Sequence, residues 1–478
     1  MGHISRKSMI STDVPRERAI VLHPQLRGDD GARSAQARLS EAIGLAAAID
    51  LDVVHGEIAV INKPRPSTLF GEGKVEEVIG LLDALAETSQ EGGSKSRPGL
   101  VIVDGALSPV QHRNLEKAWN LKVLDRTALI LEIFGARAST AEGRLQVDLA
   151  HLTYQRSRLV RSWTHLERQR GGAGFLGGPG ERQIEADRRA LAGKIDRLKA
   201  KLEQVRRTRT LQRAKRSRAP QPVVALVGYT NAGKSTLFNH LTKADVKAQD
   251  LLFATLDPTM RALVLPSGEE IVLSDTVGFI SELPTQLVAA FRATLEEVQE
   301  ADIIVHVRDI AHEDTDAQRS DVLKVLKELG VDGDPSGDGD APQVVEALNK
   351  IDLLSEEDCA TVQAIARLSS EHAAATLDEP FQICVSAQEG TGVAALCDVI
   401  DGLLTADRLC VRVTLSPQDG AARAWLFDHG DVQESVHDEL IETINIRLSE
   451  KVLGQFGKLF PQITHRRISN DKYNRRSA

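Results

Sequence analysis

The chain of 478 residues is 42% hydrophobic but only 4% aromatic, carries a net charge of −9 and contains four cysteines. This length exceeds one hydrophobic core and predicts several domains with aliphatic interiors. The start of the chain is polar, no apolar stretch is as long as a membrane span, and the cysteines are scattered. These features argue against a secretory signal, a membrane span, a disulfide framework and a zinc site, so we expect a cytoplasmic protein.

Residues 1–138 alternate between strand-like and helix-like patterns. Strands are expected at 19–22, 53–61, 100–103 and 122–124, and helices at 33–48, 74–86 and 109–119. This alternation predicts an N-terminal α/β domain with a small, mostly parallel sheet and helices packed on it. The sequence of this domain shows no nucleophile, general base or metal-ligand cluster that would indicate its role.

Residues 139–218 predict an antiparallel coiled-coil hairpin. Ser139 and Glu142 have the spacing of a capping box at the start of a long helical pattern. Apolar residues then recur at alternating steps of four and three, as in a heptad seam. The first seam contains Leu145, Leu149, Leu152, Leu159, Trp163 and Leu166, and the second contains Ile184, Leu191, Ile195, Leu198, Leu202 and Val205.

The two seams are joined by GGAGFLGGPGE, residues 171–181, which we call the glycine-rich tip. Residues 151–220 hold 19 Lys and Arg against 6 Asp and Glu, which favours a polyanionic partner over a merely solvated helix surface. Bare backbone flanked by arginines can approach structured RNA, whereas the simpler alternative is a flexible linker that reverses the chain. The predicted RNA contacts are Arg168, Arg170, Gly171, Gly172, Gly174, Gly177, Gly178, Gly180, Arg182, Arg188 and Arg189.

The stretch GYTNAGKS, Gly228 to Ser235, fits the phosphate-binding pattern GxxxxGK[ST] and opens the predicted domain at 219–407. An apolar run at 223–227 precedes it and a helical pattern follows, so backbone N–H groups can converge on phosphate oxygens. We expect Lys234 to neutralise the β and γ phosphates and the Ser235 hydroxyl to hold Mg²⁺. Alone, the pattern fits any nucleoside-triphosphate hydrolase.

Three further motifs follow in the order that a guanine-nucleotide switch protein requires, each after a strand-like run. In DTVG, Asp275 to Gly278, the carboxylate is expected to hold Mg²⁺ through water and Gly278 to donate its N–H to the γ phosphate. In NKID, Asn349 to Asp352, Asp352 can accept two hydrogen bonds that guanine offers and adenine does not. In SAQEG, the N–H of Ala387 can contact the guanine O6. Together these motifs predict a GTP site.

The segment FATLDPT, residues 253–259, lies where a first switch belongs. Thr255 is the preferred magnesium-sensing hydroxyl, and Thr259 competes with it. Phe279 stands where a water-positioning glutamine is found in Ras-like proteins, which predicts slow intrinsic hydrolysis that is stimulated when a partner orders the switches. The Gly/Asp tract at 331–342 is expected to be a spacer.

The predicted catalytic residues are Lys234, Thr255 and Gly278, and the predicted Mg²⁺ ligands are Ser235, Thr255 and, through water, Asp275. The predicted GTP-binding residues are Gly228, Tyr229, Thr230, Asn231, Ala232, Gly233, Lys234, Ser235, Thr236, Phe253, Ala254, Thr255, Leu256, Asp257, Asp275, Thr276, Val277, Gly278, Asn349, Lys350, Ile351, Asp352, Ser386 and Ala387.

Residues 408–478 predict a small α/β C-terminal domain with a basic tail. Strands are expected at 411–415 and 422–427 and a helix at 438–456. Five basic residues fall within 465–478, for which a disordered tail is the default interpretation and RNA contact the alternative. The fold class is therefore a multidomain α/β protein with an N-terminal parallel domain, a coiled-coil hairpin, a P-loop domain and this appendage.

The order of these parts closely resembles the HflX family of ribosome-associated GTPases. The resemblance covers residues 15–407 and includes FGEGKVEE at 70–77, LSPVQHRNLE at 107–116, the glycine-rich tip, QIEADRR at 183–189 and the GTP motifs. It implies binding to the large ribosomal subunit, with the tip reaching toward the peptidyl-transferase centre. It further implies GTP hydrolysis stimulated by the ribosome and separation of ribosomes into subunits under stress or during rescue.

The leading hypothesis is therefore a GTPase that splits ribosomes, with Mg²⁺ as cofactor, GTP as substrate, the large subunit and its RNA as partner, and a monomeric state off the ribosome. One alternative is a regulatory module whose GTP state controls binding of a protein partner. Another is a ribosome-assembly GTPase, which the sequence does not distinguish from a splitting factor.

Overall fold

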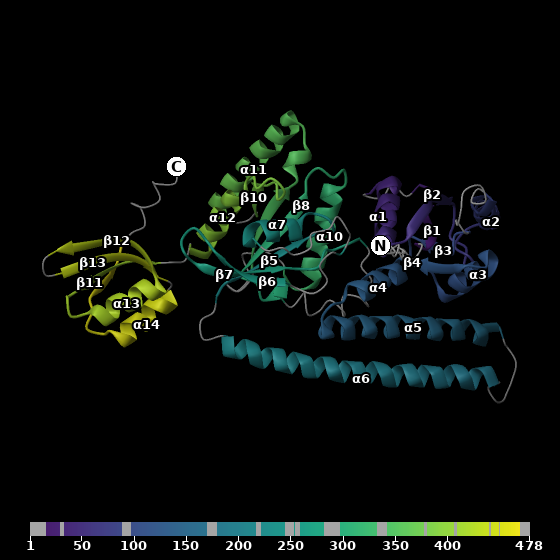
Figure 1. Ribbon diagram of the computed structural model, residues 1–478, viewed down its shortest axis with the longest axis horizontal. Coiled ribbons are helices and arrows are strands. Elements are labelled where there is room, and N and C mark those ends of the chain that lie inside the picture. Colours follow the sequence, from purple (N-terminus) through teal and green to yellow (C-terminus); the bar gives the residue numbers. More distant parts are fainter. Residues whose placement is uncertain are drawn as a thin grey trace, which may run out of the picture.

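The computed structural model describes residues 16–28, 33–87, 97–169, 179–216, 221–243, 253, 259–281, 297–331, 342–376, 380–405, 409–438, 441–448 and 450–468. Within the long helices, the side chains of 160–184, 206 and 208–216 lie outside that description. The described residues form three sheets, two of them mainly parallel, and a pair of long helices that lies along the first two (Figure 1).

The N-terminal sheet has four parallel strands in the order β2-β1-β3-β4, which confirms the predicted parallel domain. Apolar side chains on both faces of the strands are buried, as expected for a sheet covered by helices on two sides. Helices α2 and α3 cover one face, and α1 and α4 cover the other. The elements are β1 (Arg18–Leu26), α1 (Ala35–Ala47), β2 (Asp52–Ile61), α2 (Glu72–Glu87), β3 (Leu100–Val103), α3 (Pro109–Trp119), β4 (Lys122–Asp125) and α4 (Arg126–Arg137).

Two helices of this domain begin at well-formed caps. The Ser108 side chain accepts from the Gln111 N–H, and the Gln111 side chain accepts from the Ser108 N–H, with Pro109 at the first position of α3. Asp125 caps α4 by accepting from the Ala128 N–H at 2.8 Å. Helix α4 is absent from the elements expected from the sequence.

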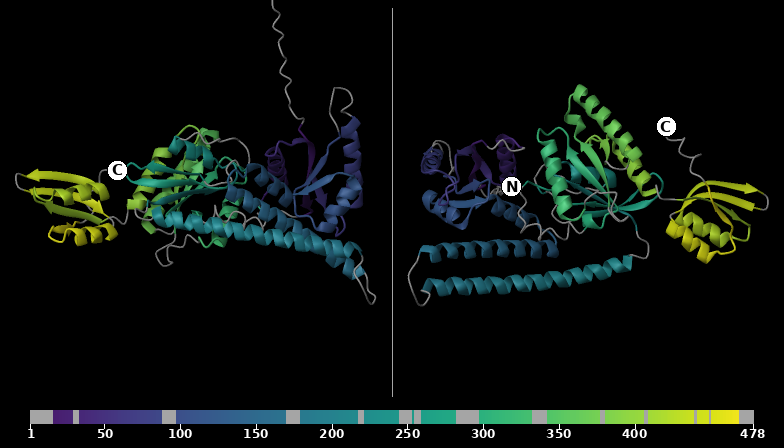
Figure 2. Two further views of the ribbon diagram at one scale, coloured as in Figure 1. Left: turned by 60° about the horizontal axis from the view of Figure 1, so that its bottom comes forward. Right: turned by 180° about the vertical axis from the view of Figure 1, so that it is seen from behind.

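The hairpin consists of α5 (Ala141–Gln169) and α6 (Pro179–Arg216), which lie side by side in every view (Figures 1 and 2). Ile195 and Leu202 of the predicted seam are buried, in agreement with the expected helix pairing. The cap differs from the expectation, because the Gly143 N–H donates to the side chain of Thr140 rather than Ser139. The cap therefore lies one residue later than expected, and the course of the helix is unchanged.

Helix α5 also has a second buried stripe that the heptad pattern does not reveal. Val147 and Ala150 join the apolar core on the α1/α4 side of the N-terminal sheet. The Tyr154 hydroxyl donates to the Asp125 carboxylate at 2.7 Å, and Arg158 donates to the same carboxylate. The hairpin is therefore fastened to the turn at which α4 begins.

The central sheet has six strands in the order β10-β9-β8-β5-β7-β6, in which β6 pairs antiparallel with β7 and the other pairs are parallel. Helices α7 and α12 pack on one face and α10 on the other. The strands are β5 (Val223–Gly228), β6 (Thr259–Val264), β7 (Glu270–Asp275), β8 (Ile303–Asp309), β9 (Gln343–Asn349) and β10 (Phe381–Cys384). The helices are α7 (Lys234–Thr242), α10 (Thr315–Glu328), the short η1 (Ile351–Leu353), α11 (Glu356–Thr376) and α12 (Val393–Thr405).

The third sheet is antiparallel, in the order β12-β13-β11-β14, and two helices cover one face. Its element order, βαββαβ, is that of a ferredoxin-like unit. The elements are β11 (Leu409–Leu415), α13 (Gly420–His429), β12 (Asp431–Asp438), β13 (Ile441–Leu448), α14 (Glu450–Leu459) and β14 (His465–Arg467).

Two expectations for this unit were wrong. Residues 422–427, expected to be a strand, belong to α13, in which Ala422 and Leu426 face the core one helical turn apart. Residues 438–456, expected to be one helix, contain strand β13 and the start of α14. The strand buries Ile444, Ile446 and Leu448 at every second position, a period of two that the earlier interpretation overlooked.

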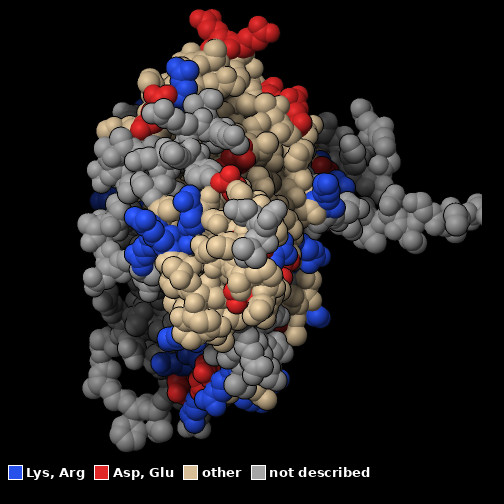
Figure 3. Space-filling model, turned by 90° about the vertical axis from the view of Figure 1, so that its left-hand side faces the viewer, with Lys and Arg blue, Asp and Glu red and all other residues tan. Residues whose placement is uncertain are grey.

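The surface at this end of the molecule is mixed in charge. Seen from the side that carries the C-terminal unit, Lys and Arg side chains are spread over the middle and lower parts, and Asp and Glu are prominent at the top (Figure 3). Among the described residues, the helices are all too short or too polar to cross a membrane.

Trp119 tests the N-terminal core. Its ring is 1% exposed beside Phe70, and its indole N–H donates to the Val75 carbonyl at 3.2 Å. We expect Trp119→Ala to cost about 3–5 kcal/mol in local unfolding, because a large cavity remains. Trp119→Phe should cost about 1–2 kcal/mol, because the packing is largely kept and one hydrogen bond is lost. Native-state hydrogen exchange of β1 and β3 measures both values, and equal effects would contradict this account.

Candidate nucleotide site

The four predicted nucleotide motifs lie at the carboxyl ends of four parallel strands of the central sheet, two on each side of β8. The loop before α7 follows β5, DTVG starts at the end of β7, NKID follows β9 and SAQEG follows β10. Ligands of open parallel sheets bind at this edge, where the loops converge. The sheet therefore brings together motifs that are up to 158 residues apart in the chain, counted from Gly228 to Ser386.

The phosphate-binding loop has no room for a side chain at two of its glycines. A Cβ on Gly228 would lie 2.2 Å from the Val307 carbonyl oxygen, and one on Gly233 would lie 2.2 Å from the Asn349 amide nitrogen. Gly233 also has φ +93°, a conformation that glycine adopts without strain. These two positions explain the spacing of the glycines in the motif.

Lys234 is enclosed by the loop that it follows. Its ammonium donates to the carbonyls of Gly228 and Tyr229 at 3.1 and 2.8 Å. Burial lowers the pKa of Lys234 to about 8, and the negative charge of Asp275 only partly offsets this effect. The Lys234 ammonium is thus held against the backbone of the loop in which phosphate oxygens are expected.

Ser235 and Asp275 are joined directly, because the Ser235 hydroxyl donates to the Asp275 carboxylate at 2.8 Å. A hydroxyl and a carboxylate are oxygen donors suited to Mg²⁺, which usually binds through few protein ligands and completes its shell with phosphates and water. The residues therefore fit the ion. Thr259, the competing switch residue, pairs with Asp275 across β6 and β7. Thr255 lies outside the described residues.

The end of the DTVG motif and the residue that follows it are held against the phosphate loop. The Phe279 N–H donates to the Gly228 carbonyl at 3.0 Å, and the Thr230 N–H donates to the Phe279 carbonyl at 2.8 Å. A Cβ on Gly278 would lie 2.9 Å from the Thr230 Cα and 3.1 Å from the Lys234 ammonium, so this glycine closes tightly over the loop. The Phe279 ring is 2% exposed within the apolar core, so it offers nothing to orient a water molecule.

Asn349 ties the base-binding side of the site together. Its amide donates to the Ala232 carbonyl at 2.8 Å and accepts from the Ala387 N–H at 2.9 Å. It therefore bridges the phosphate loop and SAQEG. Lys350, at φ +68°, forms an ion pair with Asp309 at 2.7 Å, and the Asp352 side chain is exposed at the edge of the sheet.

Several predicted site residues cannot be placed. Ala254, Thr255, Leu256 and Asp257 lie outside the described residues, as do Arg170 and residues 171–178 of the tip. The side chains of Arg168 and Arg182 are also not described. Arg188 and Arg189 are exposed on α6, with 55% and 78% of their side-chain surface accessible, beside Glu185.

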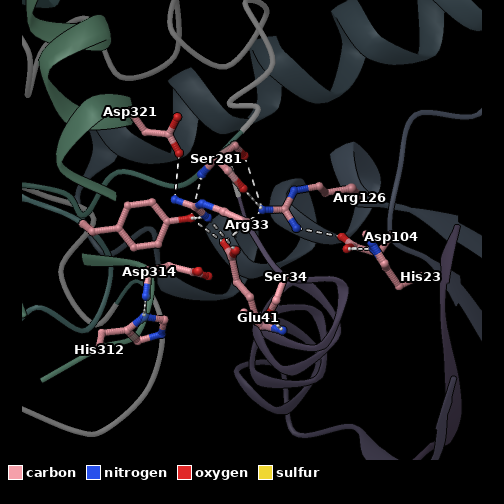
Figure 4. A network of polar contacts seen from close by, with 12 residues as sticks. His23, Arg33, Ser34, Glu41, Asp104, Arg126, Ser281, His312, Asp314 and Asp321 are labelled. Atoms are coloured by element: carbon pink, nitrogen blue, oxygen red, sulfur yellow. Dashed lines mark hydrogen bonds and ion pairs between the residues drawn. The ribbon is translucent and has the colours of Figure 1, made fainter. Parts of the chain in front are cut away.

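Sequence reasoning missed a network that connects this site to the N-terminal domain. The Tyr229 hydroxyl donates to Glu41 at 2.8 Å and accepts from Arg33 at 2.7 Å and from the Ser281 N–H at 2.8 Å. Burial and the Glu41 charge raise the pKa of Tyr229 to about 12. Figure 4 shows Arg33, Glu41 and Arg126 turned toward Ser281 between the two domains. The one sequence feature that could have indicated this network is the tyrosine at the second position of the phosphate loop.

Three family models match consecutive parts of the chain. A model described as the GTP-binding GTPase N-terminal region matches residues 36–135, and the middle region of the same GTPases matches 137–216. A model described as 50S ribosome-binding GTPase matches 223–350. With the site geometry, these matches define a P-loop GTPase, so the protein hydrolyses GTP.

The chain belongs to the HflX family of GTPases. It is 46% identical to the GTPase HflX of Magnetococcus marinus over 94% of this chain and 96% of the relative. It is 38% identical to the GTPase HflX of Escherichia coli K12 over 89% of this chain and 94% of the relative. Among solved structures, it resembles a GTP-binding protein from Sulfolobus solfataricus in complex with GDP, with a TM-score of 0.42, 22% identity, and coverage of 82% of this chain and 99% of the other.

Replacing Asp352 tests the base-binding side. An asparagine keeps the shape but presents an N–H where guanine also has one, so we expect Asp352→Asn to weaken GTP binding by about 100-fold. Xanthosine triphosphate, which has a carbonyl at that position, should bind the variant better than GTP. Fluorescence competition measures both affinities. The exposed Glu356→Gln is the matched control, and an unchanged preference for GTP in Asp352→Asn would contradict the assignment.

Proposed function

We propose that this GTPase acts as a nucleotide switch whose GTP form binds the large ribosomal subunit and separates ribosomes into subunits. The observation that carries the proposal is the combination of a G domain of the type described as ribosome-binding with a long helical hairpin fastened to the N-terminal domain. The exposed Arg188 and Arg189 lie at the tip-proximal part of α6, where RNA phosphates would be met.

In this proposal, Lys234 and the N–H groups of the phosphate loop hold the β and γ phosphates, and Asp352 selects guanine. Ser235 and Thr255 would hold Mg²⁺ directly and Asp275 would hold it through water, and the ion would offset negative charge on the phosphates. Gly278 senses the γ phosphate. The buried Phe279 leaves the attacking water without a side-chain partner, so hydrolysis is slow until an external surface orders the switches.

The hairpin supplies the contact to ribosomal RNA. Its tip is proposed to reach toward the peptidyl-transferase centre, where a basic, glycine-rich element carried by two paired helices could displace bound RNA. The pairing is supported by the buried seam residues Ile195 and Leu202, and the hairpin is held by the attachment of Tyr154 and Arg158 to Asp125. Separation of the subunits follows if the GTP form binds the large subunit in a position that excludes the small one.

GTP turnover with purified large subunits tests the proposal. We expect stimulation on the order of ten-fold or more over the free protein, because a ribosomal surface would order the switches. Lys234→Ala is the blank and should show neither basal nor stimulated turnover. Unstimulated turnover with intact GTP binding would instead favour a module that controls a protein partner.

The hairpin contact has a separate test. Replacing the arginines Arg168, Arg170, Arg182, Arg188 and Arg189 by glutamine should weaken binding to large subunits by about 100-fold, because several phosphate contacts are lost. The matched control removes five exposed basic residues farther along α6, namely Lys194, Arg197, Lys199, Lys201 and Arg207. Sedimentation with ribosomes measures binding, and equal losses in both variants would reject a specific role for the tip.

A further inference from the structure

Helix α4 of the N-terminal domain contacts the segment that follows DTVG. The Arg126 guanidinium donates to the Ser281 hydroxyl at 3.0 Å and to the Ser281 carbonyl at 3.3 Å. Arg126 is 6% exposed and is also paired with Asp104 at 2.7 Å and Glu41 at 2.9 Å. Burial by itself disfavours this charge, but the two carboxylates outweigh burial and raise the Arg126 pKa. Arg126 is thus a fixed, fully charged donor.

The same helix contacts the other switch segment. The Phe134 ring meets the Phe253 ring edge to face, with centroids 4.8 Å apart and an interplanar angle of 81°. Both rings are almost fully buried, at 1% and 3% exposure. Phe253 has φ +58°, an unfavourable conformation for a residue with a side chain, so the aromatic contact holds this backbone in place.

The two contacts are separated by two turns of α4, about 12 Å along the helix axis. Ser281 is three residues beyond Gly278, the predicted γ-phosphate sensor, and Phe253 is two residues before Thr255, the predicted magnesium sensor. One helix of the N-terminal domain therefore contacts Phe253 and Ser281, which lie within three residues of the two predicted sensors.

We propose that α4 is a positioning element of the nucleotide site, in which Arg126 and Phe134 hold the two switch segments ready for the γ phosphate and so favour GTP over GDP. The inference rests on the proposed assignment of these segments as switches. Ordering a loop at the moment of binding opposes affinity, and contacts made beforehand remove that cost. GDP lacks the phosphate that engages both segments, so it gains much less from this support.

The test uses the free full-length protein and compares the affinities for GDP and a non-hydrolysable GTP analogue. We expect Ser281→Ala and Phe134→Leu each to weaken binding of the GTP analogue by about ten-fold, with a much smaller change for GDP. Arg126→Lys keeps a positive charge near Glu41 and Asp104. A lysine lacks the planar set of N–H groups that reaches Asp104, Glu41 and Ser281 together, so this variant should behave like Ser281→Ala.

Asp321→Asn is the matched control. Arg33 forms an ion pair with Asp321 of α10 at 2.7 Å, so this substitution removes a contact between the same two domains without touching a switch segment. Its ratio of GDP to GTP-analogue affinity should equal that of the unaltered protein. If the control changes the ratio as much as Ser281→Ala does, or if the α4 and Ser281 variants weaken both nucleotides equally, the proposal is overturned.

Failure of the proposed nucleotide assignment gives a different result. In that case Lys234→Ala would leave GTP binding unchanged, whatever the α4 variants do. If Lys234→Ala abolishes binding while Ser281→Ala and Phe134→Leu keep the normal preference for the triphosphate, the nucleotide site stands and the role of α4 is rejected.

Discussion

The buried charge of Arg126 is the interaction on which the arrangement of the two α/β domains depends. Its guanidinium is shared between Asp104 and Glu41 of its own domain and Ser281 of the GTPase domain. Asp104 also accepts from His23 at 2.8 Å. Burial alone would raise the Asp104 pKa, but the His23 hydrogen bond and the Arg126 charge hold it below its usual range. Removing one partner of such a buried set costs about 3–5 kcal/mol, because the others stay charged without compensation.

Arg126 also connects this interaction to the hairpin, through the residue that precedes it in the chain. Its neighbour Asp125 ends β4, caps α4 and accepts from Tyr154 and Arg158 of the hairpin. Two consecutive residues therefore connect the sheet of the N-terminal domain, the hairpin and the segment after DTVG. Polar contacts therefore run without interruption from Tyr154 and Arg158 of the hairpin, through Asp125 and Arg126, to Ser281 beside the phosphate loop.

Much of the fold was predictable because its signals are local. The phosphate loop and NKID are recognisable because each is a short, contiguous pattern of residue types, even though the Asn349–Ala232 hydrogen bond that joins them spans 117 residues. The strands of the two parallel sheets are continuous apolar runs, as in Leu100–Val103. The heptad seam of the hairpin likewise follows from residue spacing, and its buried positions Ile195 and Leu202 are where the pattern puts them.

What escaped prediction depends on contacts between distant parts. Helix α4 is apolar on several sides because it packs against its own sheet, the hairpin and Phe253, so it shows no simple amphipathic period. In the C-terminal segment at 441–448, the polar residues Asn445 and Arg447 alternate with buried Ile444, Ile446 and Leu448, a period of two that is obscured by the polar residues around it. The partners of Tyr229 come from 188 and 196 residues away, a distance over which a single sequence gives no pairing information.

These contacts divide the proposed nucleotide site into two halves, of which one is held within the GTPase domain and the other is in contact with the N-terminal domain. The proposed base-binding half is built within the GTPase domain, because Asn349 joins the phosphate loop to SAQEG and the exposed Asp352 follows β9 of the same domain. On the proposed γ-phosphate side, Ser281 and Phe253 contact Arg126 and Phe134 of the N-terminal domain. Guanine selectivity should therefore belong to the GTPase domain itself. Discrimination between GTP and GDP should belong to the whole chain, and so be open to control by whatever the N-terminal domain and hairpin bind.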